Sequence, residues 1–470
     1  RPVTPVVRWT DGEVERSLAL PEGTSWTGQA LLGFRPARTY ELTVEMEGEP
    51  LTSAEVEVPA LPEADMPDLH VVASDPERMQ PGFTLVPYWG STGRLADAVV
   101  ALDPTGEVVY FQRVDQHVLD ARTIDGGLQL LLGGGPDSVD IREVDWLGNT
   151  LRAFRAASST AQGIPVDIPD KFTHDVVSTP DGGFVALSNR AESVDGYPVD
   201  YDDPGPTQSA EITADAVVAF DATGAVSWEL PLTEVLDPTR VGFDGLANGN
   251  SGAYSWGHSN SLWVEDDGRI GVSVRNQDVV VLLDPVARAV DWMLGTPANW
   301  DEPWREVLLT PTGPLEWPSH QHAAHRDADG LITMFDNGNY RASPGEVPFD
   351  DLPPPTERYS RVVRYAVDEA EGTVTQVAAF DLSGSAGPVY SEALGDADLL
   401  PNGDVLGVYG RIVSDGGKLN RELGYAEFSV RIVEWDPQGR EVFHLHLTTD
   451  PAAYPEGWNT YRAERFADFR

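Results

Sequence analysis

The sequence contains no cysteine, has only two lysines, Lys171 and Lys418, and has no long apolar run. Without cysteine the fold uses neither disulfide bonds nor thiolate metal ligands. Because arginine supplies nearly all the positive charge, its planar fork is available for binding oxyanions. A membrane-spanning helix needs about 20 consecutive apolar residues, so we expect no such span.

Positive charge is scarce: 32 Lys and Arg residues stand against 76 Asp and Glu residues, a net charge of -44. Binding to nucleic acid depends on clustered basic residues that neutralise phosphates, so we expect no nucleic-acid partner. A solvated acidic surface explains the charge most simply and is typical of exported or salt-tolerant proteins, with calcium sites as the alternative. The chain begins at Arg1 rather than Met. We therefore expect a removed export signal and a periplasmic or secreted location.

The composition favours an all-β fold. The sequence has 45 Gly and 37 Pro and no sustained run of apolar residues at helical spacing, which indicates short strands separated by turns. At 470 residues the chain is too long for one ordinary core. A large closed β-architecture, two or three domains, or both are therefore required.

Residues 1–66 are predicted to form a small β-sandwich of the immunoglobulin or fibronectin-III type. Strands are indicated at residues 32–36, 40–44 and 54–58, and Tyr40 stands where such folds use a tyrosine to anchor a corner. Residues 59–67 are rich in Pro, Glu and Asp and form the expected linker.

Residues 67–470 contain two alternating kinds of turn. One turn has an aspartate after an apolar strand, usually followed by glycine, and its copies are at Asp103, Asp145, Asp221, Asp284, Asp368 and Asp436. The other is an Asp-Gly or Asn-Gly hairpin, at Asp125, Asp181, Asp267, Asp329 and Asn402. Two hairpins make a four-stranded blade, so the six copies predict a six-bladed β-propeller. Several separate β-sandwiches would explain the strands but not the alternation.

Five of the nine histidines fall in three short segments of this region. They are His174, His258, and the group His320, His322 and His325. The innermost strand of each propeller blade lines the central channel, so histidines at equivalent places should face one axial site. A hydrogen-bonded core role is the simpler reading of a lone histidine, and His70, His117, His444 and His446 are assigned that role.

Arginines and amides follow the same turns. They are Arg190, Arg275, Asn337 and Arg411, and Asn260 lies two residues after His258. Cations placed beside histidines in so acidic a chain indicate a local pocket for a small anion.

Several of these segments resemble the bacterial arylsulfotransferases. They are GHSNS at 257–261 leading to VRNQ at 274–277, QHAA at 321–324 leading to FDNGN at 335–339, residues 359–369, and YRA at 461–463. The resemblance extends over roughly residues 80–470 in the same order, and the His-x-Asn to Arg-x-Gln block is its most specific part.

The resemblance implies a sulfotransferase that is independent of 3'-phosphoadenosine and needs no cofactor or metal. His322 would take the sulfuryl group from an aryl sulfate ester and pass it from a sulfohistidine to a phenol by a ping-pong mechanism. His174, His258, Asn260 and Arg275 would hold the sulfate oxygens. We add the following residues as substrate-binding: His320, Asn337, Arg190 and Arg411. The predicted partners are the aryl sulfate donor and the phenolic acceptor, and a homodimer is left open.

Two features depart from the family pattern. His320 would share a strand face with His322, so either could be the nucleophile. Residues 195–211 form an acidic insert that we cannot match to the family pattern. We expect a flexible acidic loop there, with shaping of the pocket rim or calcium binding by its carboxylates as the alternatives.

Three other functions fit the same residues. A polysaccharide lyase also uses His, Tyr and Arg near a propeller axis to act on an anionic glycan. Imidazoles spaced as His320-x-His322 could hold zinc or iron. The propeller could also be a binding scaffold without catalysis.

Overall fold

The computed structural model describes residues 4–20, 30–62, 66–90, 97–133, 140–168, 170–203, 205–247, 252–384 and 387–469. Within them nearly all the regular secondary structure is strand, which confirms the all-β prediction. The helical elements are single 3-10 turns: η2 (Leu232–Glu234), η3 (Arg275–Gln277), η4 (Trp304–Val307), η5 (Phe349–Asp351) and η6 (Asn420–Leu423).

The N-terminal strands form one four-stranded antiparallel sheet in the order β2-β1-β3-β4. Their bounds are β1 (Val6–Thr10), β2 (Glu15–Ala19), β3 (Arg38–Met46) and β4 (Glu49–Val58). The hydroxyl of Tyr40 accepts a hydrogen bond from the Arg35 backbone N–H at 2.8 Å, as a corner tyrosine does. The strand predicted at residues 32–36 is wrong, because that segment is irregular. A second sheet, which a sandwich needs, is absent from the described N-terminal residues.

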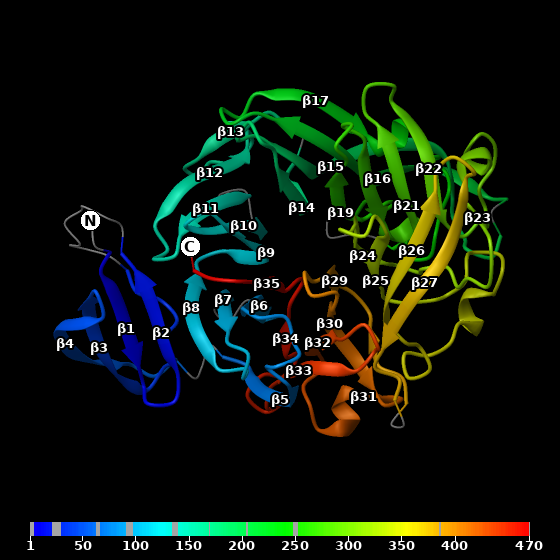
Figure 1. Cartoon of the computed structure of the whole chain (residues 1–470). Helices are drawn as coiled ribbons and strands as arrows, with labels where there is room; N and C mark the ends of the chain where they lie inside the picture. Colours follow the sequence, from blue (N-terminus) through cyan, green and yellow to red (C-terminus); the bar gives the residue numbers. More distant parts are fainter. Residues whose placement is uncertain are drawn as a thin grey trace.

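Six further sheets lie among the described residues, arranged around a common centre (Figure 1). Three come from the first half of the ring. The strands of the first sheet are β6 (Phe83–Gly90), β7 (Asp97–Leu102), β8 (Val108–Val114), β34 (Trp458–Asn459) and β35 (Glu464–Phe466). The second sheet consists of β9 (His117–Ile124), β10 (Gly127–Gly133), β11 (Ile141–Asp145), β12 (Thr150–Ala156) and β13 (Ile164–Val166). The third contains β14 (Phe172–Ser178), β15 (Phe184–Pro198), β16 (Thr207–Phe220), β17 (Val226–Pro231) and β18 (Tyr254–Ser255).

The other three sheets complete the ring. The fourth contains β19 (Ser259–Val264), β20 (Ile270–Val274), β21 (Val279–Asp284) and β22 (Ala289–Gly295). The fifth consists of β23 (Thr310–Pro311), β24 (His322–Arg326), β25 (Ile332–Asp336), β26 (Arg361–Asp368) and β27 (Thr373–Asp381). The strands of the sixth are β28 (Tyr390–Ser391), β29 (Asp396–Leu399), β30 (Val405–Asp415), β31 (Lys418–Leu419), β32 (Ser429–Trp435), β33 (Glu441–Thr448) and β5 (Asp68–Ser74).

Both predicted turn types lie where the repeat placed them. The six aspartate turns join β7–β8, β11–β12, β16–β17, β21–β22, β26–β27 and β32–β33, and in each the carboxylate accepts the backbone N–H two residues on. The five glycine hairpins join β9–β10, β14–β15, β19–β20, β24–β25 and β29–β30. The first sheet has no such hairpin because its inner strands, β34 and β35, come from the C-terminal end of the chain.

Strands from both ends of the chain close the ring. β5 pairs with β33 in the sixth sheet, while β34 and β35 pair with β6 in the first. In Figure 1 the red C-terminal strands accordingly lie beside the blue and cyan ones. Ring closure thus brings C-terminal residues to the centre of the molecule.

Both ends of the insert at 195–211 are strand, so only residues 199–203 and 205–206 of the described insert are irregular, and the flexibility predicted for the loop stays a prediction. β15 and β16 continue as a hairpin and remain paired as far as Pro198 and Thr207. Its outer part is held by aromatic packing, since the Tyr197 ring stacks on Tyr254 at 5.4 Å.

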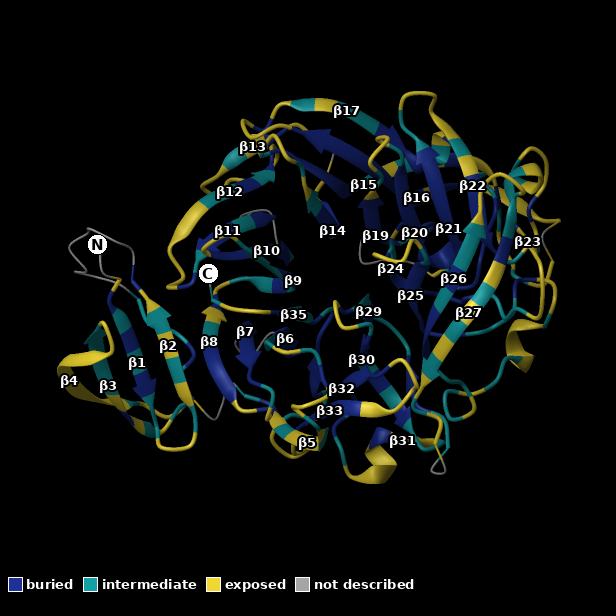
Figure 2. Cartoon of the chain, in the orientation of Figure 1, coloured by how far each residue is buried: buried dark blue, intermediate teal, exposed yellow. Residues whose placement is uncertain are grey.

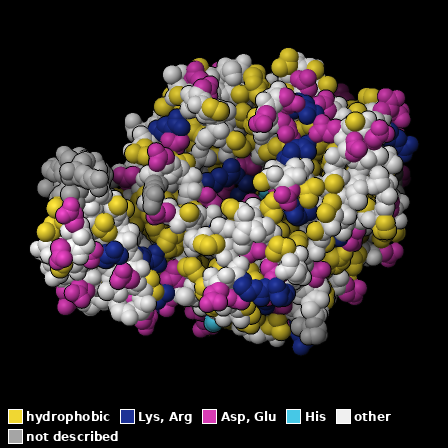
Figure 3. Space-filling view, in the orientation of Figure 1, with side chains coloured by type: hydrophobic (Ala, Val, Ile, Leu, Met, Phe, Trp, Pro, Cys, Tyr) yellow, Lys and Arg dark blue, Asp and Glu magenta, His cyan; other side chains and the backbone are white. Residues whose placement is uncertain are grey.

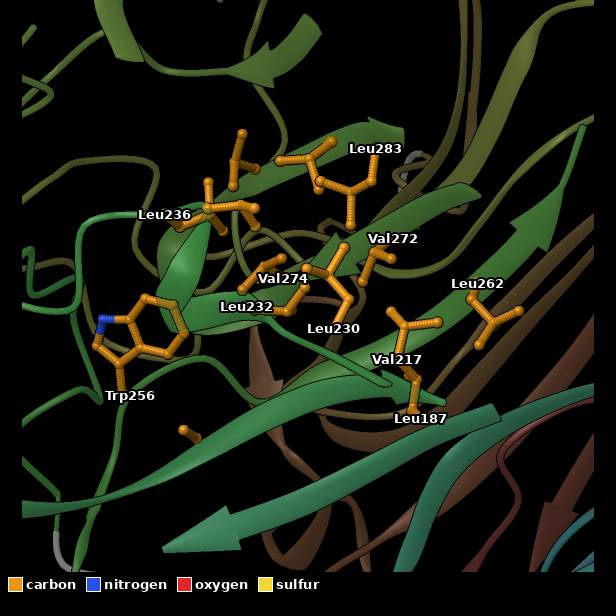
Figure 4. Packing of buried hydrophobic residues seen from close by; sticks show 14 of the residues in the cluster. Leu187, Val217, Leu230, Leu232, Leu236, Trp256, Leu262, Val272, Val274 and Leu283 are labelled. Atoms are coloured by element: carbon orange, nitrogen blue, oxygen red, sulfur yellow. The ribbon is translucent and has the colours of Figure 1, made fainter. Parts of the chain in front are cut away.

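Apolar side chains pack between neighbouring sheets. Figure 4 shows such a contact between the third and fourth sheets, where Leu187 and Val217 meet Leu262 and Val272, and the fully buried Trp256 lies at the other end of the cluster. The inner strands are mostly buried, whereas the N-terminal β4 is exposed along nearly its whole length (Figure 2). The inner strands are therefore a rigid base for side chains at the ring centre.

Candidate active site

Histidines at the centre of the ring stand on strained backbone. His174, His258 and His320 have φ of 51°, 54° and 55°, in the left-handed region that non-glycine residues rarely adopt. The pairing of β14, β19 and β24 with their neighbours is also interrupted near these residues. Such strain costs about 1–3 kcal/mol per residue and tends to occur at functional sites.

Three imidazoles converge around one tyrosine. The rings of His174 and His258 lie 4.8 Å apart between centroids. Tyr461 turns its edge toward both His174, at 6.2 Å, and His322, at 5.8 Å. The convergence expected from the repeat is therefore present for His174, His258 and His322.

Arg275 supplies positive charge beside these rings. It belongs to η3 and is only 7% exposed. Burial lowers the pKa of His174 to about 4 and the pKa values of His258 and His322 well below the ordinary value, and the charge of Arg275 lowers all three further. All three imidazoles are thus neutral at neutral pH. Figure 3 shows basic side chains in the hollow at the middle of this face.

The imidazole of His322 has a fixed tautomer. The Asn337 amide nitrogen donates to the backbone carbonyls of Ser391 and Leu394, both at 2.9 Å, so its oxygen must be the atom facing the ring. That oxygen lies 2.7 Å from His322 Nδ1, which must therefore carry the proton and donate it. Nε2 of His322 is left with a free lone pair.

His320 is held in the opposite state. Its Nδ1 lies 2.9 Å from Asp278 Oδ1, and its Nε2 lies 3.2 Å from the Phe243 carbonyl and 3.4 Å from Asp244 Oδ2. Burial lowers the pKa of His320, but the charge of Asp278 and the hydrogen bonds to Asp244 and Asp278 outweigh it and raise the pKa. A ring that donates from both nitrogens has no lone pair for attack.

Asn260 lies within the same group of strands. Its amide nitrogen donates to the Gln321 carbonyl at 2.7 Å, joining β19 to the segment before β24. Its side-chain oxygen is buried and has no hydrogen-bond partner among the described residues. Asn260 therefore has an unused polar atom beside the histidines.

The other sequence-predicted residues have different surroundings. Arg190 forms ion pairs with Glu192 at 2.7 Å and Glu229 at 3.3 Å. Arg411 pairs with Glu392 at 2.9 Å and stacks over Phe428 at 3.6 Å. Both guanidinium groups are engaged by acidic side chains. The hydrogen bonds of Asn337 orient His322, and the substrate-binding role predicted for Asn337 stays a prediction.

Sequence reasoning assigned no role to several residues that shape the site. Asp278 and Asp244 bind His320, and the Tyr340 ring lies 5.0 Å from it. Arg462 donates to Asp175 at 2.9 Å, next in sequence to His174. The C-terminal pair Tyr461–Arg462 was visible in the sequence, but only ring closure shows that it reaches the centre.

A second, acidic cavity lies further along the same inner strands. Its volume is about 330 Å³, and His325 lines it. The acidic residues around it are Asp120, Asp175, Asp396, Asp398 and Glu464, with Arg122 and Arg462 among them. Burial raises the pKa of Asp396 to about 8 and that of Asp398 to about 6. His325 is therefore separate from the other predicted histidines, with Nε2 3.9 Å from Asp398.

In the described ranges, no group of three or more His, Cys, Asp or Glu side chains is arranged to hold a metal ion. No helix in those ranges is long and apolar enough to cross a membrane.

The all-β ring thus brings three neutral histidines and a buried arginine together at its centre. The sequence model of the family Arylsulfotransferase (ASST) matches residues 69–459. The chain therefore belongs to the arylsulfotransferase family.

Two relatives carry the name arylsulfate sulfotransferase AssT. The protein from Escherichia coli O6:H1 is 29% identical over 184 residues, which cover 35% of this chain and 29% of that protein. The protein from Lelliottia amnigena is 26% identical over 207 residues, 34% of this chain and 33% of that protein. The matched segments thus span about a third of the length of these relatives. A solved structure from Bacteroides caccae, of unknown function, aligns with 82% of this chain and 100% of its own at 12% identity and a TM-score of 0.40.

Proposed function

We propose that this protein transfers a sulfuryl group from an aryl sulfate ester to a phenol, through a sulfohistidine on His322 and without 3'-phosphoadenosine. The observation that carries the proposal is the Asn337 amide, which leaves His322 Nε2 unprotonated and free to attack. His320 is the weaker candidate because both of its nitrogens face acceptors. Family membership supports the choice of substrate.

The proposed reaction has two balanced halves. In the first, the Nε2 lone pair forms a bond to sulfur while the ester S–O bond breaks and a phenolate leaves. In the second, the acceptor oxygen bonds to sulfur, the N–S bond breaks, and the phenolic proton passes to solvent by way of His174 or His258.

Sulfuryl transfer, like phosphoryl transfer, needs positioning and charge stabilisation more than bond-making power. Arg275 is suited to this because its buried fork lies beside all three neutral rings. The free oxygen of Asn260 cannot bind a sulfate oxygen directly, so its amide nitrogen or a water would make that contact.

The wider architecture is part of the same proposal. We propose that residues 67–470 form a six-bladed propeller, supported by six sheets with the two alternating turns. Residues 1–66 form an N-terminal domain built on the sheet β2-β1-β3-β4, and the protein acts in the periplasm or outside the cell. Its substrates are small aryl sulfates and phenols.

The test is turnover of 4-nitrophenyl sulfate with and without phenol, together with intact-protein mass spectrometry. We expect phenol-dependent release of nitrophenolate and a sulfated chain when phenol is omitted. His322→Ala should abolish both signals, whereas His320→Ala should still form the adduct at a reduced rate. An adduct of normal yield in His322→Ala would refute the assignment of the nucleophile.

A further inference from the structure

The loop between η2 and β18 brings a carboxylate to the sulfuryl pocket. Asp244 Oδ2 lies 3.3 Å from Arg275 Nη1 and 3.4 Å from His320 Nε2, so one oxygen contacts both cations. The backbone carbonyl of the preceding Phe243 faces the same His320 nitrogen at 3.2 Å. The loop thus contacts the two positively charged groups of the site at once.

A negative charge at this place opposes the binding of an anion. Asp244 also adopts φ of 66°, a conformation that costs energy for any residue other than glycine. A carboxylate that both repels the substrate and strains the backbone needs another reason to be there. Its contacts supply one, because fixing the Arg275 fork orients the donors that must match the transition state.

The extended hairpin holds this loop from outside. Tyr197, on β15, donates its hydroxyl proton to the Gly245 carbonyl at 2.8 Å. The Tyr201 hydroxyl accepts the Leu246 backbone N–H at 3.0 Å, and its ring packs on Phe243 at 5.4 Å. Both tyrosines lie in the 195–211 insert, which therefore contacts the residues on each side of Asp244.

A third tyrosine, Tyr340, contacts the Asp244 side chain directly. Tyr340 donates its hydroxyl proton to Asp244 Oδ1 at 2.7 Å, and its ring lies 5.0 Å from Phe243. Phe349 of η5 stacks on Tyr201 at 5.0 Å and packs on Phe243 at 5.7 Å. Two chain segments far apart in sequence therefore fix Asp244: Tyr340 bonds its carboxylate, and the hairpin bonds the backbone that follows it.

We propose that Asp244 is a positioning residue that orients Arg275 and His320, and that the β15–β16 hairpin holds it in place through Tyr197 and Tyr201. This inference rests on the proposed function for its kinetic consequences. The insert thereby acquires a role: it fixes the geometry of the site from outside the ring of inner strands.

The kinetic test uses Asp244→Asn and Tyr201→Ala in the full chain with 4-nitrophenyl sulfate in single turnover. Misplacing a catalytic group by about 1 Å can cost on the order of 100-fold in rate, so Asp244→Asn should lower the rate of donor cleavage by about that factor. Its dissociation constant for the donor should stay equal or fall, because a repelling charge is gone. Tyr201→Ala should also lower the rate of donor cleavage without raising the dissociation constant for the donor, and the loss of rate should be smaller, about 10-fold.

The controls separate positioning from folding. Asp195→Asn, whose side chain bonds Ser209 across the same hairpin, should behave as wild type. Asp244→Glu should recover part of the rate. Combining Asp244→Asn with Tyr201→Ala should cost less than the sum of the two single losses, because both act on one contact. A donor affinity that falls in step with the rate, or full additivity, would overturn the inference.

Nuclear magnetic resonance of 15N-histidine decides the same question without turnover. The charged and polar groups around the His320 ring are Asp278, Asp244, Arg275 and Tyr340. The pKa of His320 should be lower in Asp244→Asn than in wild type, because one carboxylate that raises it is gone. An unchanged titration would refute the positioning role. A wild-type chain that never becomes sulfated would refute the proposed function alone.

Discussion

Two regions along the same inner strands have opposite chemistry. In the histidine pocket, the carboxylates Asp244 and Asp278 are paired with cations, and burial lowers the pKa values of His174, His258 and His322. In the acidic cavity, carboxylates outnumber arginines, and burial raises the pKa values of Asp396 and Asp398. In both regions burial favours the neutral form of the group.

The difference lies in which buried groups find a partner of opposite charge. Asp175 stands at the border, where Arg122 and Arg462 both contact its carboxylate, and the charges of these arginines help to lower its pKa against the effect of burial. Asp396, which lines the same acidic cavity from the sixth sheet, accepts the Ala463 backbone N–H at 3.3 Å. A buried carboxylate keeps its charge here only where an arginine reaches it.

The largest effect should come from Arg275, the cation shared by the whole histidine pocket. Arg275→Ala should lower kcat/KM for 4-nitrophenyl sulfate by about 1000-fold, in the range seen when one transition-state donor is removed. Arg275→Lys keeps the charge but loses the fork, and should recover only part of the loss. Nitrophenolate release at saturating phenol measures both.

Arg411→Ala is the matched control, because this guanidinium is paired with Glu392 and stacked on Phe428. It should cost less than 10-fold, in keeping with a side chain already engaged elsewhere. Equal losses of kcat/KM in Arg275→Ala and Arg411→Ala would mean that Arg411 also binds the anion.

The next effect concerns the border between the two regions. Asp175→Asn leaves the half-buried Arg122 and Arg462 without their shared, fully buried carboxylate, and should lower the free energy of unfolding by about 3 kcal/mol. The midpoint of urea unfolding measures it. Asp267→Asn, in an exposed turn, is the control and should change the midpoint little. If both variants unfold alike, the charge pairing at Asp175 contributes nothing to stability.

Sequence reasoning captured the repeat because each turn carries its own local signal. The carboxylate of Asp221, for example, accepts the N–H of Thr223 within the turn, so neighbouring residues alone determine it. The hairpin at 195–211 carried no such signal, since Tyr197 and Tyr201 are held by the distant residues 245 and 246. Strand extension there depends on tertiary packing.

The same limit applied to the site. The spacing of the repeat predicted that His174, His258 and His322 converge. It could not distinguish His320 from His322, because both were expected on the same face of one strand. They differ in partners: an amide oxygen for His322, and two carboxylates for His320. The role of Asp244 could not be predicted, because no local sequence pattern distinguishes it from the other aspartates of an acidic chain.

The smallest effect should be a pH dependence that differs in sign between the two regions. The folded pKa of Asp396 is raised to about 8, so the folded state binds a proton more readily than the unfolded chain, and stability falls as pH rises from about 4 to 8. The folded pKa of His174 is lowered to about 4, so its contribution is lost as pH falls from about 6.5 to 4.

Asp396→Asn removes the first dependence. It should stabilise the protein by about 1 kcal/mol at pH 8, a rise of about 1 °C in melting temperature, and the gain should vanish near pH 4, where the wild-type carboxyl is already neutral. His174→Asn should instead raise the melting temperature relative to wild type only below about pH 6, because it has no proton to gain. Melting curves of the three proteins between pH 4 and 8 measure both effects. A gain that is the same at every pH would show that the two regions differ in packing and not in charge.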